Sequence, residues 1–374
     1  MKSIPTLGRG AGVLACVFLL PAIVELLRDP AQFFRSYLVA FLFVLAPALG
    51  ALTWILIARL TGGRWGEALG DVLESAASTL PVLGLLFLPL LLGLEKVFPW
   101  AEPGWALDES NPLHQREFLR APFFVGRAAF FFLVWIGLAR LVSSRNPPGS
   151  FASRHQVIIG ALGLIAVLLT VALSSVDWGM SLSPGWYSSI YGLLTIVAYA
   201  LAGLSAAILL RLFLASVTGS ELPRDTLQDL GSLLFASVLT WGYLSFSQLL
   251  IMWSANLPEE VTWYVERLGP GWSEVGVVLL IVHLFLPFFL LLMRKVKRRV
   301  ASLAAVSALI LAARLPETLW MIVPSFGLRG PIIHWLDVVL PVSFFAGWSF
   351  LVLRNLERGP ATLESRSPGT VEAA

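Results

Sequence analysis

The sequence predicts an all-α, polytopic membrane protein, because the chain is apolar, carries few charges and contains regularly spaced apolar runs. Of its 374 residues, 57% are hydrophobic and 13% are charged, and the mean hydropathy is +0.81. A typical soluble domain is about 45–50% apolar and about 25% charged, and folding buries at most about 75% of a chain's surface. This composition excludes a soluble enzyme, a disordered chain and a secreted disulfide scaffold, and nothing in it points to nucleic acid.

Ten apolar runs are long enough to cross a bilayer, which takes about 20 residues of helix. Lipid cannot hydrogen-bond to the backbone, so each run is expected to be helical. The predicted spans are 10–27, 36–60, 75–94, 123–142, 156–176, 187–215, 230–253, 273–293, 300–323 and 332–355. The first span is expected to be retained, because Glu25 and Arg28 stand where a signal cleavage site needs small residues. Together these spans form one membrane domain over 1–356, and the polar residues 357–374 predict a disordered cytoplasmic tail.

The distribution of basic residues predicts that both termini lie in the cytoplasm. With the N-terminus inside, the inner segments hold 17 Lys and Arg residues and the outer loops hold 7, and cytoplasmic loops normally carry the excess. The run RKVKRR at 294–299 is the strongest single marker. A site for lipid headgroups is the alternative interpretation of this run.

No motif for covalent chemistry or for a bound redox centre occurs in the sequence. The single cysteine, Cys16, excludes a Cys-ligated zinc or iron–sulfur site and c-type haem attachment within this chain. His283 is the one histidine expected near mid-membrane, so no bis-histidine haem pair is predicted. The chain is therefore expected to hold no covalently bound cofactor and to catalyse no covalent chemistry alone.

Two outer loops, 174–192 and 253–272, combine carboxylates, aromatic residues, Gly and Pro. A quinone site needs an apolar slot near the interface and one or two groups that exchange protons with the quinol oxygens. The candidate quinone-binding residues are Asp177 with Tyr187, or Gln248 and Trp253 with Glu259 and Glu260. The acids are equally compatible with helix caps or solvated loops, and Gln248 with a hydrogen bond between helices.

Ionisable residues within the spans predict a second kind of site, because charge in a bilayer is costly and usually functional. The candidate proton-transfer residues are Glu74, His283, Arg314, Glu317 and Asp337. Arg314 and Glu317 are three residues apart and share a helix face, so they either neutralise each other or form part of a proton path with Asp337. His283 is either a neutral structural residue or a proton relay. Glu74 either admits protons or is an ordinary acid at the membrane interface.

Several stretches of the sequence resemble one family of respiratory subunits. They are RSYLVAFLF at 35–43, LTGGRWGEALGDVLESAASTLP at 60–81, NPLHQREFLRAPFF at 111–124, DWGMSLSPGWYSSIYG at 177–192, YLSFSQLLIMWSANLPEEVTWYVERL at 243–268 and HWLDVVLP at 334–341. Together they resemble the quinone-binding membrane subunit 2 (ActF-type) of bacterial alternative complex III, in the superfamily of polysulfide-reductase-type membrane subunits. The block SQLLIMWSANLPEE is the most specific of them.

This resemblance implies a fold, a set of partners and a location. It implies two four-helix bundles, here 36–176 and 187–323, flanked by spans 10–27 and 332–355. It further implies a multi-pass subunit of the bacterial inner membrane, within a complex that oxidises menaquinol and passes electrons to cytochrome c. Haem c and iron–sulfur subunits and a paralogous quinone-binding subunit would be its partners, besides membrane lipids.

The sequence thus leads to one main functional hypothesis and two alternatives. The main hypothesis is a membrane subunit that contributes a quinone-facing pocket, a proton-transfer path or both, while electrons pass through partner subunits. The alternatives are a secondary transporter, which usually shows interrupted helices at matching points of its two halves, and a purely structural subunit.

Overall fold

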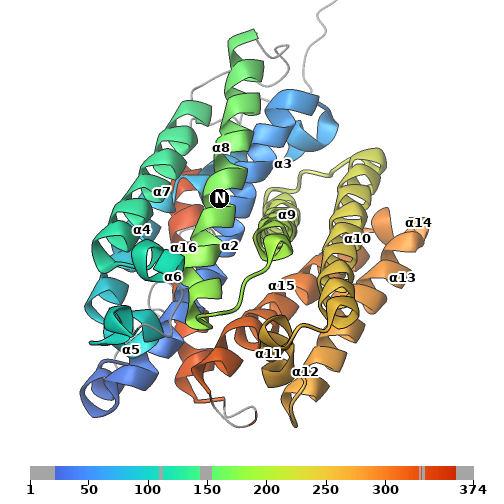
Figure 1. Ribbon diagram of the computed structural model, residues 1–374. Coiled ribbons are helices and arrows are strands. Elements are labelled where there is room, and N and C mark those ends of the chain that lie inside the picture. Colours follow the sequence, from blue (N-terminus) through green and yellow to red (C-terminus); the bar gives the residue numbers. More distant parts are fainter. Residues whose placement is uncertain (1–21, 109–112, 144–153, 328–329, 331–332, 359–374) are drawn as a thin grey trace, which may run out of the picture.

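The computed structural model describes residues 22–108, 113–143, 154–327, 330 and 333–358 of the chain, and it contains no β-strand among them. Figure 1 shows helices that run side by side through the molecule. Nine helical segments of the described residues are long and apolar enough to cross a membrane, which is consistent with a multi-pass membrane protein. They are α2 (Pro30–Thr61), α3 and α4 (Arg64–Ala77, Leu80–Leu92), α7 (Ala121–Val142), α8 with η3 (Arg154–Trp178, Met180–Leu182), α9 (Ser189–Thr218), α10 (Arg224–Ala255), α12, η4 and α13 (Trp272–Leu279, Leu280–Phe285, Leu286–Leu292), α15 with η5 (Val300–Ile322, Val323–Phe326) and α16 (Leu336–Arg358).

These nine segments coincide with the second to tenth spans predicted from the sequence, so the helical class and these nine apolar spans are confirmed. The count of ten is not confirmed, because most of the first predicted span lies outside the described residues. Its last part, 22–28, is helical. The predicted tail, 357–374, also lies almost entirely outside the described part of the chain.

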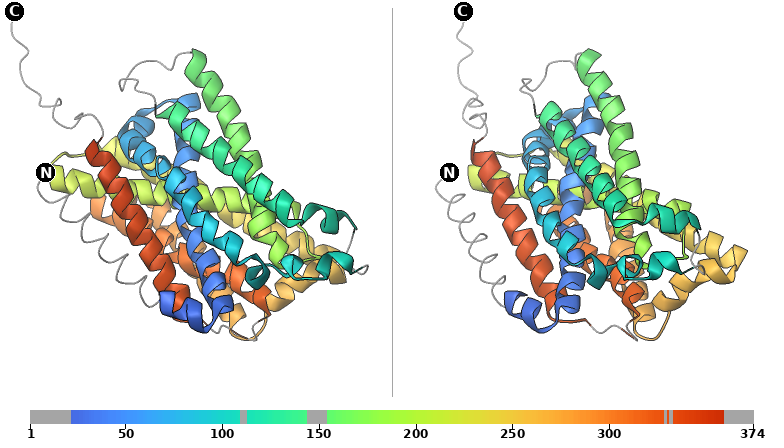
Figure 2. Two further views of the ribbon diagram at one scale, coloured as in Figure 1. Left: turned by 90° about the vertical axis from the view of Figure 1, so that its left-hand side faces the viewer. Right: turned by 60° about the vertical axis from the view of Figure 1, so that its left-hand side comes forward.

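Helix α2 is enclosed by other helices along most of its length. Within its apolar core 94% of the residues are buried, and its main neighbours are α9, α16, α3 and α8. Figure 2 shows α16, in red, running alongside α2, in blue. Because every side of α2 meets protein, the helix needs no polar or lipid-facing stripe, and its sequence is apolar all round.

For reference, α2, α3 with α4, α7 and α8 are here called the first group, and α9, α10, α12 with α13, and α15 the second group. Contacts between α2 and α9 are the most extensive in the molecule and join the two groups, while α16 packs on α2 and α3.

The junction of the two groups depends on two glycines. A Cβ on Gly50 of α2 would lie 1.9 Å from the Tyr199 carbonyl oxygen, and one on Gly203 of α9 would lie 2.4 Å from the Gly50 carbonyl carbon. Small residues allow helix backbones to approach closely in membranes, where packing rather than water drives association. The two groups are thus joined by direct contact between backbones.

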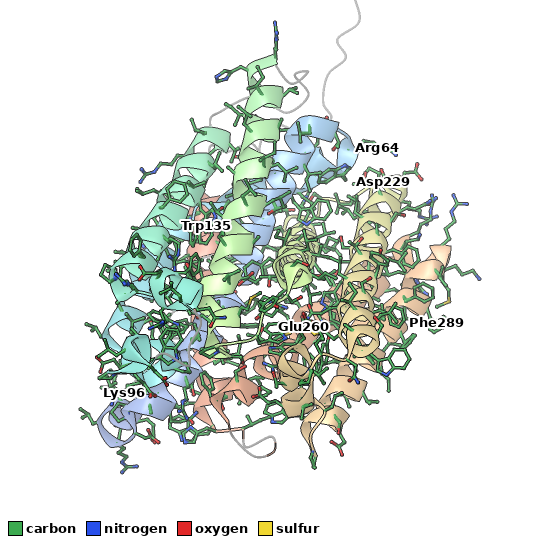
Figure 3. All side chains as sticks on the ribbon, in the orientation of Figure 1. Arg64, Lys96, Trp135, Asp229, Glu260 and Phe289 are labelled. Carbon is green, nitrogen blue, oxygen red and sulfur yellow. The ribbon has the colours of Figure 1, made fainter. Side chains whose placement is uncertain are left out.

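Since consecutive spans run in opposite directions, the two ends of the molecule differ in chemistry. One end, here the Trp-rich end, carries the tryptophans Trp100, Trp186, Trp253, Trp263 and Trp272, and the other, the basic end, carries the arginines Arg59, Arg64, Arg154, Arg224 and Arg294. Figure 3 shows Arg64 and Asp229 at the basic end, where their ion pair of 3.1 Å links α3 to α10.

Large apolar side chains cover the outer faces of the helices between these ends. Leu133 on α7 is 72% exposed, and Phe289, which projects outward from α13 in Figure 3, is 59% exposed. A soluble monomer rarely presents so much contiguous apolar surface. These faces are therefore suited to contact with lipid.

Candidate functional site

A buried acidic residue, Glu317, lies on α15 one turn from Arg314, and the two charges form an ion pair. Arg314 Nη1 is 2.6 Å from Glu317 Oε2, and both side chains are more than 90% buried. The i,i+3 spacing that placed them on one helix face therefore also pairs them, as one of the two sequence interpretations required. One of the two residues between them is Pro316, which has no backbone N–H to donate to the Ala312 carbonyl oxygen. The helix is therefore locally weakened beside the pair.

His283 reaches Glu317 from a different helix by means of an irregular turn. The segment Leu280–Phe285 is a π-helix between α12 and α13, and such single turns are frequent at functional sites because the extra residue redirects side chains. His283 is 1% exposed, and its Nδ1 lies 3.4 Å from Glu317 Oε2 without an aligned hydrogen bond.

Trp241 of α10 completes the group and was not predicted from the sequence. Its Nε1 donates a hydrogen bond of 2.8 Å to Glu317 Oε1. Its ring stacks on the imidazole of His283, with ring centres 4.5 Å apart and planes 15° from parallel. Trp241, His283, Arg314 and Glu317, here called the Glu317 cluster, thus bring three helical segments of the second group together around one carboxylate.

Some buried nitrogen and oxygen atoms of the Glu317 cluster make no aligned hydrogen bond. Neither His283 Nδ1 nor Arg314 Nε has a hydrogen-bond partner within the described structure, and Glu317 Oε2 accepts no aligned hydrogen bond. A buried polar atom without a partner costs about 1–3 kcal/mol, and more when the group is charged. These atoms remain available for hydrogen bonds to water or to a ligand.

A small cavity borders the cluster where α15 faces α8 and α9. It is lined by Leu42, Ser175, Trp178, Gly179, Tyr191, Leu194, Thr195, Ala198, Tyr199, Arg314, Glu317, Thr318, Met321 and Ile322. The volume open to the centre of a water molecule is about 40 Å³. One bound water needs roughly 10–15 Å³ by this measure, whereas ligand pockets enclose about 300–1,000 Å³. The cavity therefore fits two or three water molecules and excludes a quinone ring.

Asp177, a predicted quinone-binding residue, is held in a separate ion pair in the first group. Arg127 of α7 donates from Nε and Nη2 to the two carboxylate oxygens, both at 2.8 Å, and Asp177 is fully buried. Arg127 also donates to the Phe118 carbonyl oxygen. Since this two-pronged contact occupies both oxygens of Asp177, the pair favours a role in packing α7 against α8.

The other predicted quinone-binding residues do not form one pocket in the described structure. The rings of Tyr187 and Trp253 are 57% and 75% exposed, whereas Gln248 is buried with neither amide atom hydrogen-bonded. The Glu260 carbonyl oxygen accepts a hydrogen bond from Trp186. The side chain of Glu259 lies outside the described part of the chain.

Two predicted proton-transfer residues lie away from the Glu317 cluster. Asp337 accepts hydrogen bonds from Ser36 Oγ of α2 at 2.6 Å and from the His334 backbone nitrogen at 2.9 Å, so it fastens the start of α16 to α2. Glu74 lies near the basic end, 3.7 Å from Arg59 Nη2. Of the five candidates, the structure brings only His283, Arg314 and Glu317 together.

Arg267 is a buried cation at the Trp-rich end that the sequence analysis did not single out. It lies in α11 (Pro258–Arg267), a short helix outside the spans. Its guanidinium covers the Trp263 ring at 3.6 Å and donates to the Met321 carbonyl oxygen and to Ser325 Oγ. Burial lowers the pKa of Arg267 to about 9, because desolvation disfavours its charge. The residue fixes α11 against the end of α15, one turn beyond Glu317.

No family model matches the chain, and no curated protein is similar to it at a significant level. Within the described residues, no group of three or more His, Cys, Asp or Glu side chains is placed to hold a metal ion. The chemistry of the site therefore has to be inferred from the Glu317 cluster and the cavity beside it.

Proposed function

We propose that this chain is a multi-pass subunit of a quinol-oxidising respiratory complex in the bacterial inner membrane, and that its Glu317 cluster transfers protons for that complex. One observation carries the proton-transfer part: a buried carboxylate contacts Arg314, Trp241 and His283 and borders a cavity of the size of a few water molecules. The respiratory part rests on the resemblance in sequence.

The arrangement suits reversible protonation of Glu317. The Arg314 guanidinium and the Trp241 N–H stabilise the carboxylate, while burial stabilises the neutral acid. His283 lies at 3.4 Å as a second group able to carry a proton. The cluster therefore offers two neighbouring groups, Glu317 and His283, on which a proton can reside at this depth.

The geometry beside the Glu317 cluster favours a proton path over a quinone pocket at that place. The cavity is too small for a ring-shaped ligand, and the candidate quinone-binding residues are dispersed or already paired. In the proposal, quinol oxidation and the passage of electrons to cytochrome c take place with partner subunits that carry haem c and iron–sulfur centres and with a paralogous quinone-binding subunit. Both termini then lie in the cytoplasm, on the side of the basic end.

The test is the turnover of the assembled complex with Glu317→Gln, a substitution that keeps the shape and removes the charge. We expect quinol oxidation coupled to proton movement to fall by about 10²-fold or more, the usual contribution of a positioned proton donor. His283→Gln is the second variant, and Glu102→Gln, which alters an exposed acid at the Trp-rich end, is the control. The yield and melting temperature of each complex establish that it has assembled.

Normal turnover of correctly assembled Glu317→Gln and His283→Gln complexes would refute proton transfer and leave a structural subunit. Isolation of the native chain as a lone homo-oligomer, active in transport when placed in liposomes, would favour a secondary transporter. The interruptions at Ser78–Thr79, between α3 and α4, and at η4, between α12 and α13, are features that such a transporter would share.

A further inference from the structure

Two tyrosine hydroxyls of α9 face the cavity beside the Glu317 cluster. Tyr191 and Tyr199 both line it and are 3% and 5% exposed. Eight residues of helix separate them, which is about 12 Å at 1.5 Å per residue. The cavity therefore has one hydroxyl near each end of its length.

Buried hydroxyls normally find a partner, from the protein or from water. The cavity provides room for two or three waters. Beside it, Arg314 Nε has no hydrogen-bond partner, and the Glu317 carboxylate, which is paired with Arg314 Nη1, can accept a further hydrogen bond. A water needs two to four polar partners to be held in a protein interior. The two hydroxyls, the carboxylate and the guanidinium supply that number.

Tyr191 lines the part of the cavity that is nearest the Trp-rich end. It lies two residues after the start of α9 at the Trp-rich end, and its ring packs edge-on against Trp186, with ring centres 5.6 Å apart. Its hydroxyl rests against Gly179, where an added Cβ would lie only 2.4 Å away. The space for this hydroxyl thus depends on a glycine that follows α8.

We propose that the cavity is a water site and that Tyr191 relays protons between these waters and the Trp-rich end. In each transfer, the Glu317 carboxylic acid gives one proton to a water, and that water gives another of its protons to the next. The Tyr191 oxygen accepts a proton from the last of these waters and releases its own proton to a water at the Trp-rich end. No bond between heavy atoms changes, no oxidant is needed, and every group regains its starting form when Glu317 is reprotonated.

This inference rests on the proposed function, and its test uses the assembled complex. Tyr191→Phe removes only the hydroxyl, and Gly179→Ala places a methyl group where that hydroxyl lies. Tyr37→Phe is the matched control, because Tyr37 is also a buried tyrosine but donates to the Leu86 carbonyl oxygen at 2.8 Å, away from this cavity. The measurements are turnover, the solvent deuterium isotope effect and a density map that resolves water.

We expect Tyr191→Phe and Gly179→Ala to lower turnover by about tenfold or more and to raise the solvent isotope effect, since a proton step then limits the rate. Tyr37→Phe should keep the native values. The map of the native complex should show water within hydrogen-bond distance of Tyr191 Oη and of Glu317. The melting temperatures show whether each variant has assembled normally.

The outcomes separate this inference from the proposed function. Loss of turnover in Glu317→Gln together with native behaviour in Tyr191→Phe would overturn the relay and leave the proposed function standing. A native map without water beside Tyr191 would overturn the water site. Native turnover in Glu317→Gln would overturn the proposed function and the relay with it.

Discussion

Two buried carboxylates of this protein differ in how their oxygens are used. Asp177 has both oxygens occupied by one guanidinium, whereas Glu317 divides its contacts between Trp241, Arg314 and His283. Protonation of either carboxylate removes the charge that its arginine pairs with, but the neutral Glu317 acid keeps Trp241 and His283 as polar neighbours. The same side-chain chemistry is therefore suited to packing in the first group and to proton exchange in the second.

The role assigned to Asp177 can be tested by its effect on stability. Asp177→Asn leaves Arg127 without its partner beside a fully buried site, and we expect the free energy of unfolding in detergent to fall by about 3–5 kcal/mol. Replacing both residues by Leu should cost less than the sum of the two single changes, because no unpaired charge remains.

The control for this prediction is Glu117→Gln. Glu117 pairs with Arg120, but both side chains are more than half exposed, so its loss should cost at most about 1 kcal/mol. A stability of Asp177→Asn equal to that of this control would show that the Asp177–Arg127 pair does not hold α7 and α8 together.

At the level of single residues, the sequence identified the charged members of the Glu317 cluster but not their neutral partners. Arg314, Glu317 and His283 are conspicuous because ionisable groups are rare in apolar spans. Trp241 and Tyr191 are not, since aromatic residues are common throughout such a chain. Their contacts depend on how each helix is rotated about its axis, and α9 and α10 show no marked periodicity from which that rotation could be read.

Among the elements, the crossing of α2 and α9 controls how the two groups fit together. Gly50 and Gly203 bring the two backbones into contact, and this contact positions Tyr199 of α9, which lines the cavity. The π-turn of η4 is a second such device, because without its extra residue His283 would be rotated by about 100° relative to α12. Neither feature follows from hydropathy, which locates helices but not their approach.

The crossing predicts a large effect of a small substitution. A methyl group on Gly50 would lie 1.9 Å from the Tyr199 carbonyl oxygen, so the backbones must separate. We expect Gly50→Ala to lower the free energy of unfolding by about 1–3 kcal/mol, the usual cost of overpacking. The measurement is thermal or denaturant unfolding in detergent.

Gly126→Ala on α7 is the matched control, because a Cβ there meets nothing within 4 Å. It should be neutral or slightly stabilising, since Ala is favoured over Gly in helices. Equal stability of the two variants would contradict the direct contact of backbones between α2 and α9.

At the scale of the whole molecule, nine spans could be predicted from the sequence because uncharged runs of about 20 apolar residues are typical of membrane helices and rare in soluble proteins. Most bounds differ by a few residues, where polar turns of helix extend beyond the apolar core, as at the start of α10. The largest difference is in the third span, which begins at Arg64 and not at residue 75. The helix α11 was not predicted, because it is short and lies within a loop rich in aromatic residues and acids.

The difference between the two ends predicts the orientation of the protein. In a chain whose Cys16 is replaced by Ser, we expect Glu102→Cys at the Trp-rich end to react with a membrane-impermeant maleimide in intact bacterial cells. Lys295→Cys at the basic end should react only after the cells are permeabilised, because basic loops are retained in the cytoplasm. Both positions are exposed. The reverse pattern of labelling would place the termini outside.

The enclosure of α2 has a consequence for how the protein is made. A ribosome produces α2 well before α9 and α16, and during that interval the helix has no neighbours on the sides that these two later cover. Ser36, which ends bonded to Asp337, and the bare backbone at Gly50 face lipid or a biogenesis factor until then. Nascent chains halted before α16 therefore expose the side of α2 that α16 later covers. The cell's insertion and quality-control machinery has to cover this side until α16 is inserted.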